Sequence, residues 1–146
     1  ILAIAMLFLL MSSPALGEGR QLFLNVYVDD TPGKALVVGN VDDASGLSFL
    51  DDSDSIHEDN GQIYAVCDSL VKKDDDGWTL SFPAGGYYEE YHAVFFVPGG
   101  FTFHEINCTD GLEILSTAYN GSIILDVQGF ELTDPAVNFR YVEASS

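Results

Sequence analysis

Basic residues are scarce in this chain. Lysine and arginine together number 5 in 146 residues, against 23 aspartates and glutamates, so the formal net charge is −18. So few cations cannot neutralise a phosphate backbone, which argues against nucleic-acid binding by this domain. The same sign of charge disfavours adsorption to an anionic membrane surface.

Apolar runs long enough to span a membrane are also missing, since a spanning helix needs about 20 residues. The longest run, Ile1–Met11, is followed by Pro14 and then by Ala15-Leu16-Gly17. A short apolar segment before small residues at −3 and −1 is typical of a secretory signal peptide. We therefore predict a signal peptide over 1–17, a folded domain over 18–142 and the start of a linker over 143–146. The alternative for Ile1–Met11 is a buried core strand.

Only two cysteines are present, Cys67 and Cys108. An exported chain folds in a compartment where disulfides persist. A bridge would close a loop of about 40 residues and stabilise the fold by about 3–4 kcal/mol in a chain-entropy treatment. Two interpretations stay open, a disulfide and a pair of buried thiols.

Long amphipathic helices are absent, and the chain after Glu18 alternates with period two. The even positions of Leu22–Val28 are aliphatic, which predicts a strand with one buried face. A turn cluster and the segment Lys34–Val41 follow, so the pair predicts a hairpin. Further strands are predicted over 78–82, 91–97 and 136–142 and from Phe101 onward. The segment Ile63–Val71 suits a strand or a short helix, and we favour a strand.

The clearest local signal is TAYNGSIILDVQG. Its Asn120-Gly121 pair is typical of a type I′ hairpin turn, in which both turn residues need a positive φ. A two-residue turn places Tyr119 opposite Ser122 and Ala118 opposite Ile123. Together the short strands and Gly, Pro and Asp turns predict an all-β fold, an antiparallel β-sandwich of about eight or nine strands. A closed β-barrel is the alternative.

The acidic stretch DDSDSIHEDNG offers oxygen ligands of the kind that calcium prefers. The calcium candidates are Asp52, Asp54, Glu58, Asp59 and Asn60. Their spacing does not match the EF-hand loop, and the alternative is a solvated surface loop. A second acidic turn, Lys72–Gly77, is expected only to face water. No other cofactor is predicted.

Catalytic motifs are missing. No G-x-S-x-G elbow and no phosphate-binding loop occur. His92 and His104, on consecutive predicted strands close to Glu89, Glu90 and Glu105, form the only arrangement that suggests zinc. Asn107 and Asn120 begin glycosylation sequons, and the cluster of Tyr87, Tyr88 and Tyr91 beside two glutamates suits stacking on sugars or a partner.

Several runs carry a resemblance to a known group of proteins. They are GKALVVGNVDD, GQIYAVCDSL, GWTLSFPAGGYYEEYHAVFFVPGG and GLEILSTAYNGSIILDVQGFELTDP. This cadence of glycine, aromatic and turn residues resembles the exported N-terminal β-domains of archaeal membrane proteins. Some of these are joined through a C-terminal transmembrane helix to a winged-helix domain inside the cell. The resemblance implies a sensory or adhesive ectodomain, with a membrane anchor beyond residue 146, and carries over no functional residue.

The sequence thus predicts an exported, non-catalytic binding or sensory ectodomain or cell-envelope module. Loops at the ends of the sandwich, chiefly Asp42–Gly61 and Pro83–Tyr91, are expected to contact a protein or glycan partner outside the cell. Two alternatives remain, a calcium-stabilised surface-layer module and a small secreted hydrolase that uses carboxylates.

Overall fold

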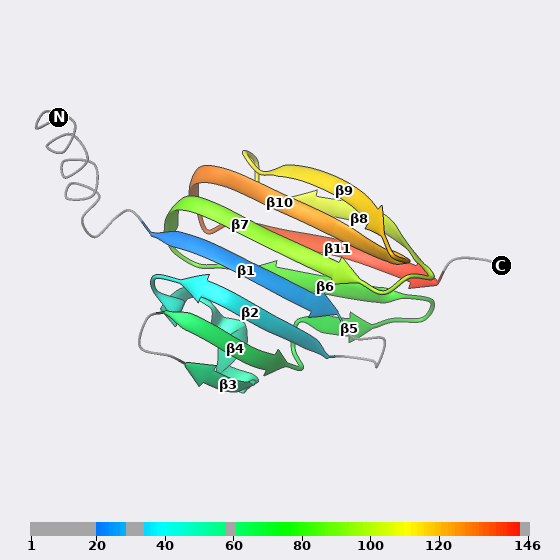
Figure 1. Cartoon of the computed structure of the whole chain (residues 1–146), viewed down its shortest axis with the longest axis horizontal. Coiled ribbons are helices and arrows are strands. Elements are labelled where there is room, and N and C mark those ends of the chain that lie inside the picture. Colours follow the sequence, from blue (N-terminus) through cyan, green and yellow to red (C-terminus); the bar gives the residue numbers. More distant parts are fainter. Residues whose placement is uncertain (1–19, 29–33, 58–60, 144–146) are drawn as a thin grey trace, which may run out of the picture.

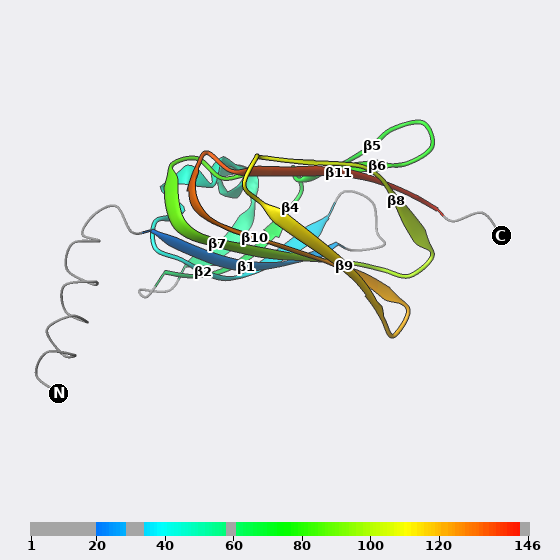
Figure 2. The same cartoon turned by 90° about the horizontal axis from the view of Figure 1, so that it is seen from above.

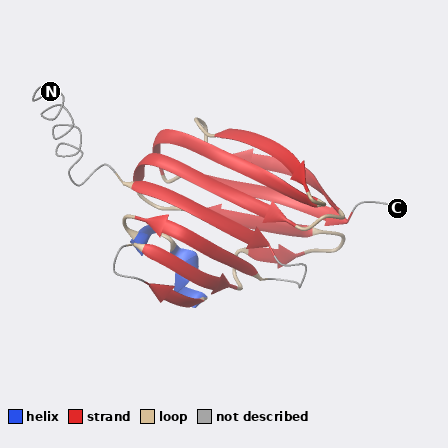
Figure 3. Cartoon of the chain, in the orientation of Figure 1, coloured by secondary structure: helices blue, strands red, loops and turns tan. Residues whose placement is uncertain are grey.

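The computed structural model describes residues 20–28, 34–57 and 61–143. Within these residues the chain forms eleven strands and two short 3-10 helices (Figure 1). The strands are β1 (Gln21–Val28), β2 (Ala35–Val41), β3 (Asp54–His57), β4 (Gln62–Cys67), β5 (Val71–Lys73), β6 (Trp78–Pro83), β7 (Tyr87–Val97), β8 (Phe101–Cys108), β9 (Glu113–Tyr119), β10 (Ser122–Thr133) and β11 (Ala136–Glu143). The helices are η1 (Ala44–Gly46) and η2 (Ser48–Asp52), and both lie between β2 and β3 (Figure 3).

The strands form two sheets that pack face to face. The larger has seven strands in the order β3-β4-β2-β1-β7-β10-β9, and the smaller has four in the order β5-β6-β11-β8. Figure 2 shows the two layers edge-on, with β6 and β11 over β1, β7 and β10. Both sheets end in free edges within the described chain, so the predicted sandwich is confirmed and the closed-barrel alternative is wrong.

The core lies between the sheets and is built from alternate residues of each strand. Rings from both layers meet at its centre, where Phe95 of β7 contacts Phe82 of β6 and Phe139 of β11. The ring centroids are 5.3 and 5.4 Å apart, and both contacts are edge-to-face. All three rings are buried. Because these contacts cross between the layers, they fix how the two sheets sit on each other.

The register predicted for the Asn120-Gly121 hairpin is confirmed, and β1 and β2 form the predicted antiparallel pair. Tyr119 lies opposite Ser122 and Ala118 opposite Ile123 in the β9–β10 pair, as the Asn-Gly turn predicts. Asn120 has a φ of +52°, the left-handed conformation that this turn type requires. The even positions of β1 are all buried, as the alternation in its sequence predicts.

The larger sheet is not purely antiparallel. β1 pairs with β2 antiparallel on one side and with β7 parallel on the other. The remaining strand pairs of the described chain are antiparallel. The parallel pair joins residues about 70 positions apart, and no local sequence pattern announces such a contact.

The segment Asp42–Gly61 is not the open display loop that the sequence predicts. It contains η1, η2 and β3, and Leu47, Phe49 and Leu50 are buried. The Phe49 ring lies 5.0 Å from that of Phe82. These apolar side chains are part of the hydrophobic core, so the first half of the segment packs against the two sheets. The ambiguous segment Ile63–Val71 is a strand over most of its length, and a turn separates β4 from β5.

Of the two interpretations left open for Cys67 and Cys108, the disulfide is not formed, and both residues are free thiols. Cys67 ends β4 in the larger sheet, opposite Ala35, whereas Cys108 ends β8 at the edge of the smaller sheet, opposite Val137. Burial raises the pKa of the Cys67 thiol to about 11, against a hydrogen bond with Ser53 that lowers it. Cys67 therefore behaves as a small buried apolar residue, the alternative that the sequence left open.

The predicted signal peptide, residues 1–17, lies outside the described residues, as do positions 144–146 of the predicted linker. Glu143, which the sequence places in that linker, is the last residue of β11. Among the described residues no helix has both the length and the apolar character needed to cross a membrane.

Candidate functional site: the outer face of the larger sheet

The solvent-facing side of the seven-stranded sheet, which we call the outer face, is apolar over much of its area. Successive side chains of a strand point to opposite sides, so the register places alternate residues of neighbouring strands in rows across this face. One row consists of Val66, Leu36, Tyr27, Phe96 and Ile124. The next consists of Tyr64, Val38, Asn25, Val94, Asp126 and Leu115. The first row is apolar throughout, and its side chains range from half-buried to exposed. In the second row Tyr64 and Leu115 are exposed, Val94 is buried, and two polar residues interrupt the apolar ones. Apolar side chains that gather in this way on a solvent-facing sheet mark interaction surfaces.

Aromatic rings on the outer face stand on edge. Tyr27 and Phe96 stack with centroids 4.6 Å apart and planes only 12° from parallel. Two rings lying flat and side by side could not approach so closely without overlap, so the faces of these rings meet each other across the strands. Their edges therefore point to solvent, and they present a ridged apolar surface rather than open ring faces.

A histidine–aspartate pair interrupts the apolar rows. His92 Nε2 lies 2.7 Å from Asp126 Oδ1, and the imidazole also stacks on Phe23 with centroids 4.6 Å apart. Both polar side chains are about one-third exposed. Neither lies near His104, because β7 and β8 belong to different sheets. The zinc arrangement suggested by the sequence is therefore wrong.

At one end of the outer face β7 and β10 curve out of the larger sheet toward the other layer (Figure 2). The backbone N–H groups of Glu89 and Glu90 both donate to the Arg20 carbonyl, at 2.8 and 3.3 Å. Two successive residues of β7 thus share one carbonyl acceptor just before β1, which is the hydrogen-bond pattern of a β-bulge. On β10, Glu131 has a φ of +53°, an uncommon conformation for a residue other than glycine.

This bend leaves a hollow of about 440 Å³, lined by Tyr87, Glu89, Glu90, Phe130 and Glu131. We call it the acidic hollow. Phe130 is 64% exposed although it is a large apolar side chain. Three carboxylates beside two aromatic rings favour a positively charged group, through ion pairing and cation–π attraction. The row of Phe23, His92 and Gln128 lies between this hollow and the apolar rows. At the hollow the Gln21 amide on β1 donates to Glu90 Oε1 at 3.0 Å.

A second hollow, of about 380 Å³, lies toward the other end of the outer face. Its lining includes Tyr27, Lys34, Leu36, Tyr64 and Val66. Tyr64 is 51% exposed, so about half of this residue's surface can be contacted by a partner. The outer face therefore has an apolar hollow at one end and the acidic hollow at the other.

The predicted tyrosine cluster divides between core and surface. Tyr88 and Tyr91 are buried, and only Tyr87 reaches the acidic hollow. The Tyr88 hydroxyl donates to the Gly85 carbonyl at 3.0 Å. Burial raises the pKa of both buried tyrosines. In the predicted segment Pro83–Tyr91 the exposed residues are Pro83, Tyr87, Glu89 and Glu90, and the last three line the acidic hollow.

The calcium candidates are only partly placed. Glu58, Asp59 and Asn60 lie outside the described residues, while Asp52 ends η2 and Asp54 begins β3. Within the described residues no three or more histidine, cysteine, aspartate or glutamate side chains gather as a metal site would need. The described chain therefore adds no support for calcium in this stretch.

The two sequons lie in different settings. Asn120 is exposed at the tip of the β9–β10 hairpin, the position that the sequence predicts. Asn107 is also exposed, but it lies within β8 opposite Asn138. The hydroxyl of its sequon residue Thr109 accepts a hydrogen bond from the Ala136 N–H at 2.9 Å. Asn120 is therefore the more accessible of the two.

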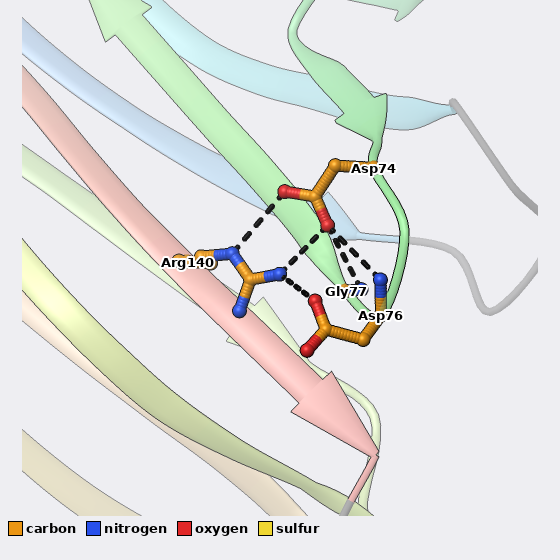
Figure 4. A network of polar contacts seen from close by, with 4 residues as sticks. All are labelled: Asp74, Asp76, Gly77 and Arg140. Carbon is orange, nitrogen blue, oxygen red and sulfur yellow. Dashed lines mark hydrogen bonds and ion pairs between the residues drawn. The ribbon is translucent and has the colours of Figure 1, made fainter.

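The acidic turn Lys72–Gly77 does more than face water, contrary to the sequence prediction. Asp74 accepts two hydrogen bonds from the Arg140 guanidinium of β11, at 2.7 and 3.2 Å, and Asp76 forms an ion pair with the same group (Figure 4). The Gly77 N–H also donates to Asp74 Oδ1, at 3.0 Å. These contacts attach the β5–β6 turn to β11. The hydrogen bonds from Arg140 are the main cause that lowers the pKa of Asp74.

Replacement of Asp74 with asparagine is expected to lower the melting temperature at neutral pH by a few degrees. Because the pKa of Asp74 is lowered in the folded state, its stabilising effect is complete above the ordinary aspartate value of about 3.9. It is lost as the pH falls below that value. Melting curves of wild type and Asp74→Asn should therefore differ at neutral pH and converge in acid. Asp75→Asn, one residue further on the same turn, serves as control, and a difference that persists in acid would contradict the expectation.

Sequence reasoning missed three parts of this surface, namely Asp126, Phe130 and the stacked pair of Tyr27 and Phe96. A signal existed for the last of these, because β1 carries aromatic residues at the odd positions that alternate with its buried aliphatic ones. The contact of His92 with Asp126 depends on the β7–β10 register, which no local sequence pattern predicts.

Among known proteins, neither a family model, nor a curated protein, nor a solved structure matches this chain.

Proposed function

We propose that this chain is an exported, non-catalytic binding domain, and that its contact surface is the outer face of the larger sheet. The observation that carries this proposal is the pair of apolar rows on that face, in a chain with a net charge of −18. A surface so rich in carboxylates keeps a protein soluble. Neighbouring apolar side chains on one side of such a protein are uncommon unless that side contacts a partner. Binding is the reason that the geometry supports best.

The partner that suits this face is a protein segment that combines apolar and basic side chains. The edge-on rings suit packing against aliphatic or aromatic side chains better than stacking on a flat sugar ring. The acidic hollow at the end of the face favours a lysine or arginine side chain. The negative field of the whole domain also speeds encounters with a basic partner and makes them salt-dependent.

Export is supported by the sequence pattern of residues 1–17, as described above. The proposed contact surface differs from the two loops expected from the sequence, because the first half of Asp42–Gly61 packs on the core. The other predicted segment, Pro83–Tyr91, contributes to the acidic hollow. The contact surface is thus a rigid sheet face with one predicted loop at its end.

A selection from a phage-displayed library of random peptides, with the domain as immobilised target, tests this function. We expect enriched peptides with apolar residues flanked by lysine or arginine. Affinities measured with the purified peptides should fall about tenfold or more for Tyr27→Ser, which removes a ring from the middle strand of the face. Ile106→Ser on β8 is the matched control, because Ile106 is 37% exposed and Tyr27 is 41% exposed.

Absence of enriched peptides, or equal losses in the two variants, would contradict the proposal. Binding of the domain to an array of neutral glycans, with the same loss in Tyr27→Ser, would keep the surface but replace the protein partner with a sugar. Turnover of any substrate that depends on a single side chain of the domain would contradict its non-catalytic character.

A further inference from the structure

The four sheet edges of this sandwich differ in how well they are protected against pairing with another strand. An edge strand exposes unpaired backbone N–H and C=O groups, and proteins protect such edges with short strands, charges, proline or bulges. β3 has only four residues, and β5 has three, of which two are lysines. β8 is interrupted by a register shift opposite Asn138–Arg140, where Glu105 has a φ of +50°.

The remaining edge, β9, has none of these devices. It has seven residues in regular register with β10 and contains no proline. Its only charged residue is Glu113 at its start, so Ile114–Tyr119 is uncharged. Leu115 and Tyr119 are 65% and 67% exposed, although both are large apolar residues. β9 is therefore the one edge in the described chain that is suited to accept another strand.

We propose that β9 pairs with β9 of a second copy of this chain, antiparallel about a two-fold axis. In a pair centred on Ser116, Leu115 lies opposite Thr117 of the second copy, and Ile114 lies opposite Ala118. Glu113 then lies opposite Tyr119, so no like charges face each other. This pairing does not rest on the proposed function, because it forms through the backbone of the sheet edge, and Leu115 is the one residue that it shares with the rows of the outer face.

Charge does not oppose a second copy at this edge. Two molecules that each carry −18 repel each other, and most surfaces would bring carboxylates together. The uncharged segment Ile114–Tyr119 lets main-chain hydrogen bonds form without that cost at the contact itself. The remaining repulsion acts at longer range, so added salt should screen it.

Sedimentation velocity of the chain over residues 18–146 tests the proposal. This chain is suitable because every strand of the described fold, and its whole core, lies between Gln21 and Glu143. We expect a reversible dimer whose dissociation constant falls as sodium chloride is raised. Ser116→Lys should weaken dimerisation about tenfold or more, because lysine on an edge strand opposes pairing. Thr102→Lys, which adds the same charge at an exposed position of the β8 edge, is the matched control.

Leu115→Lys provides a second variant on the other side of the same strand and should give the same loss as Ser116→Lys. Circular dichroism melting curves show whether each variant is folded. If Ser116→Lys does not fold, Leu115→Lys alone provides the test. A chain that stays monomeric at all concentrations and salt levels would overturn the proposal. Equal losses in the β9 variants and in Thr102→Lys would overturn it as well.

Discussion

Replacement of Phe95 with alanine is expected to lower the free energy of unfolding by about 3–5 kcal/mol, the usual cost of removing a buried phenylalanine. Phe95 is fully buried and makes edge-to-face contacts with Phe82 and Phe139, which belong to the opposite sheet. The substitution removes the ring and leaves a cavity at the centre of the sandwich. It also deletes two aromatic contacts between the layers, each of which stabilises by about 0.5–1.5 kcal/mol beyond its buried area.

Chemical denaturation followed by fluorescence of the single tryptophan measures this effect. Phe96→Ala is the matched control, because the next residue of β7 points to the outer face and is only partly buried. Its expected cost is about 1–2 kcal/mol, mainly from its stacked contact with Tyr27. If Phe96→Ala destabilised the domain as much as Phe95→Ala, the assignment of the two faces of β7 would be wrong.

Replacement of Gly39 with alanine is expected to cost about 2–6 kcal/mol. Gly39 lies in β2 with a φ of +152°, a conformation that residues with a side chain rarely adopt. A Cβ at this position would overlap the Phe23 carbonyl oxygen of β1, which backbone hydrogen bonding holds in place. Backbone strain of about 1–3 kcal/mol and overpacking of similar size therefore act together.

Gly100→Ala separates the two causes. Gly100 also has a positive φ, of +97°, but a Cβ there would meet no atom within 4 Å. Its substitution should therefore cost only the backbone strain, about 1–3 kcal/mol. The same denaturation experiment compares the two variants, and a smaller loss for Gly39→Ala than for Gly100→Ala would show that β1 can move away from β2.

The parts of the fold that sequence reasoning predicted are those that local chemistry determines. Asn120-Gly121 fixes the register of β9 with β10, because only certain residues adopt the turn and the turn length sets the pairing. The alternation of β1 likewise predicts which of its side chains are buried. In both cases residues close in sequence carry all the information that is needed.

The parts that were missed depend on contacts between distant segments. The acidic composition around Asp51 suggested a solvated loop, yet Leu47, Phe49 and Leu50 bring its first half to the core. Arg140 and Asp74 are 66 positions apart, and only the β6–β11 pairing brings them together. The candidate site was missed for the same reason, since its rows consist of single residues from five or more strands.

The parallel contact between β1 and β7 divides the larger sheet into two locally connected halves. Strands β1 to β4 can pair among themselves from residues 21–67 alone, whereas β7, β10 and β9 need residues up to 133. During synthesis strands β1 to β4 therefore leave the ribosome before β7, and β1 is an unpaired edge on one side until β7 is made. A newly made molecule should therefore pass through a stage in which the free edge of β1 can pair with an incorrect strand, for example one of another molecule.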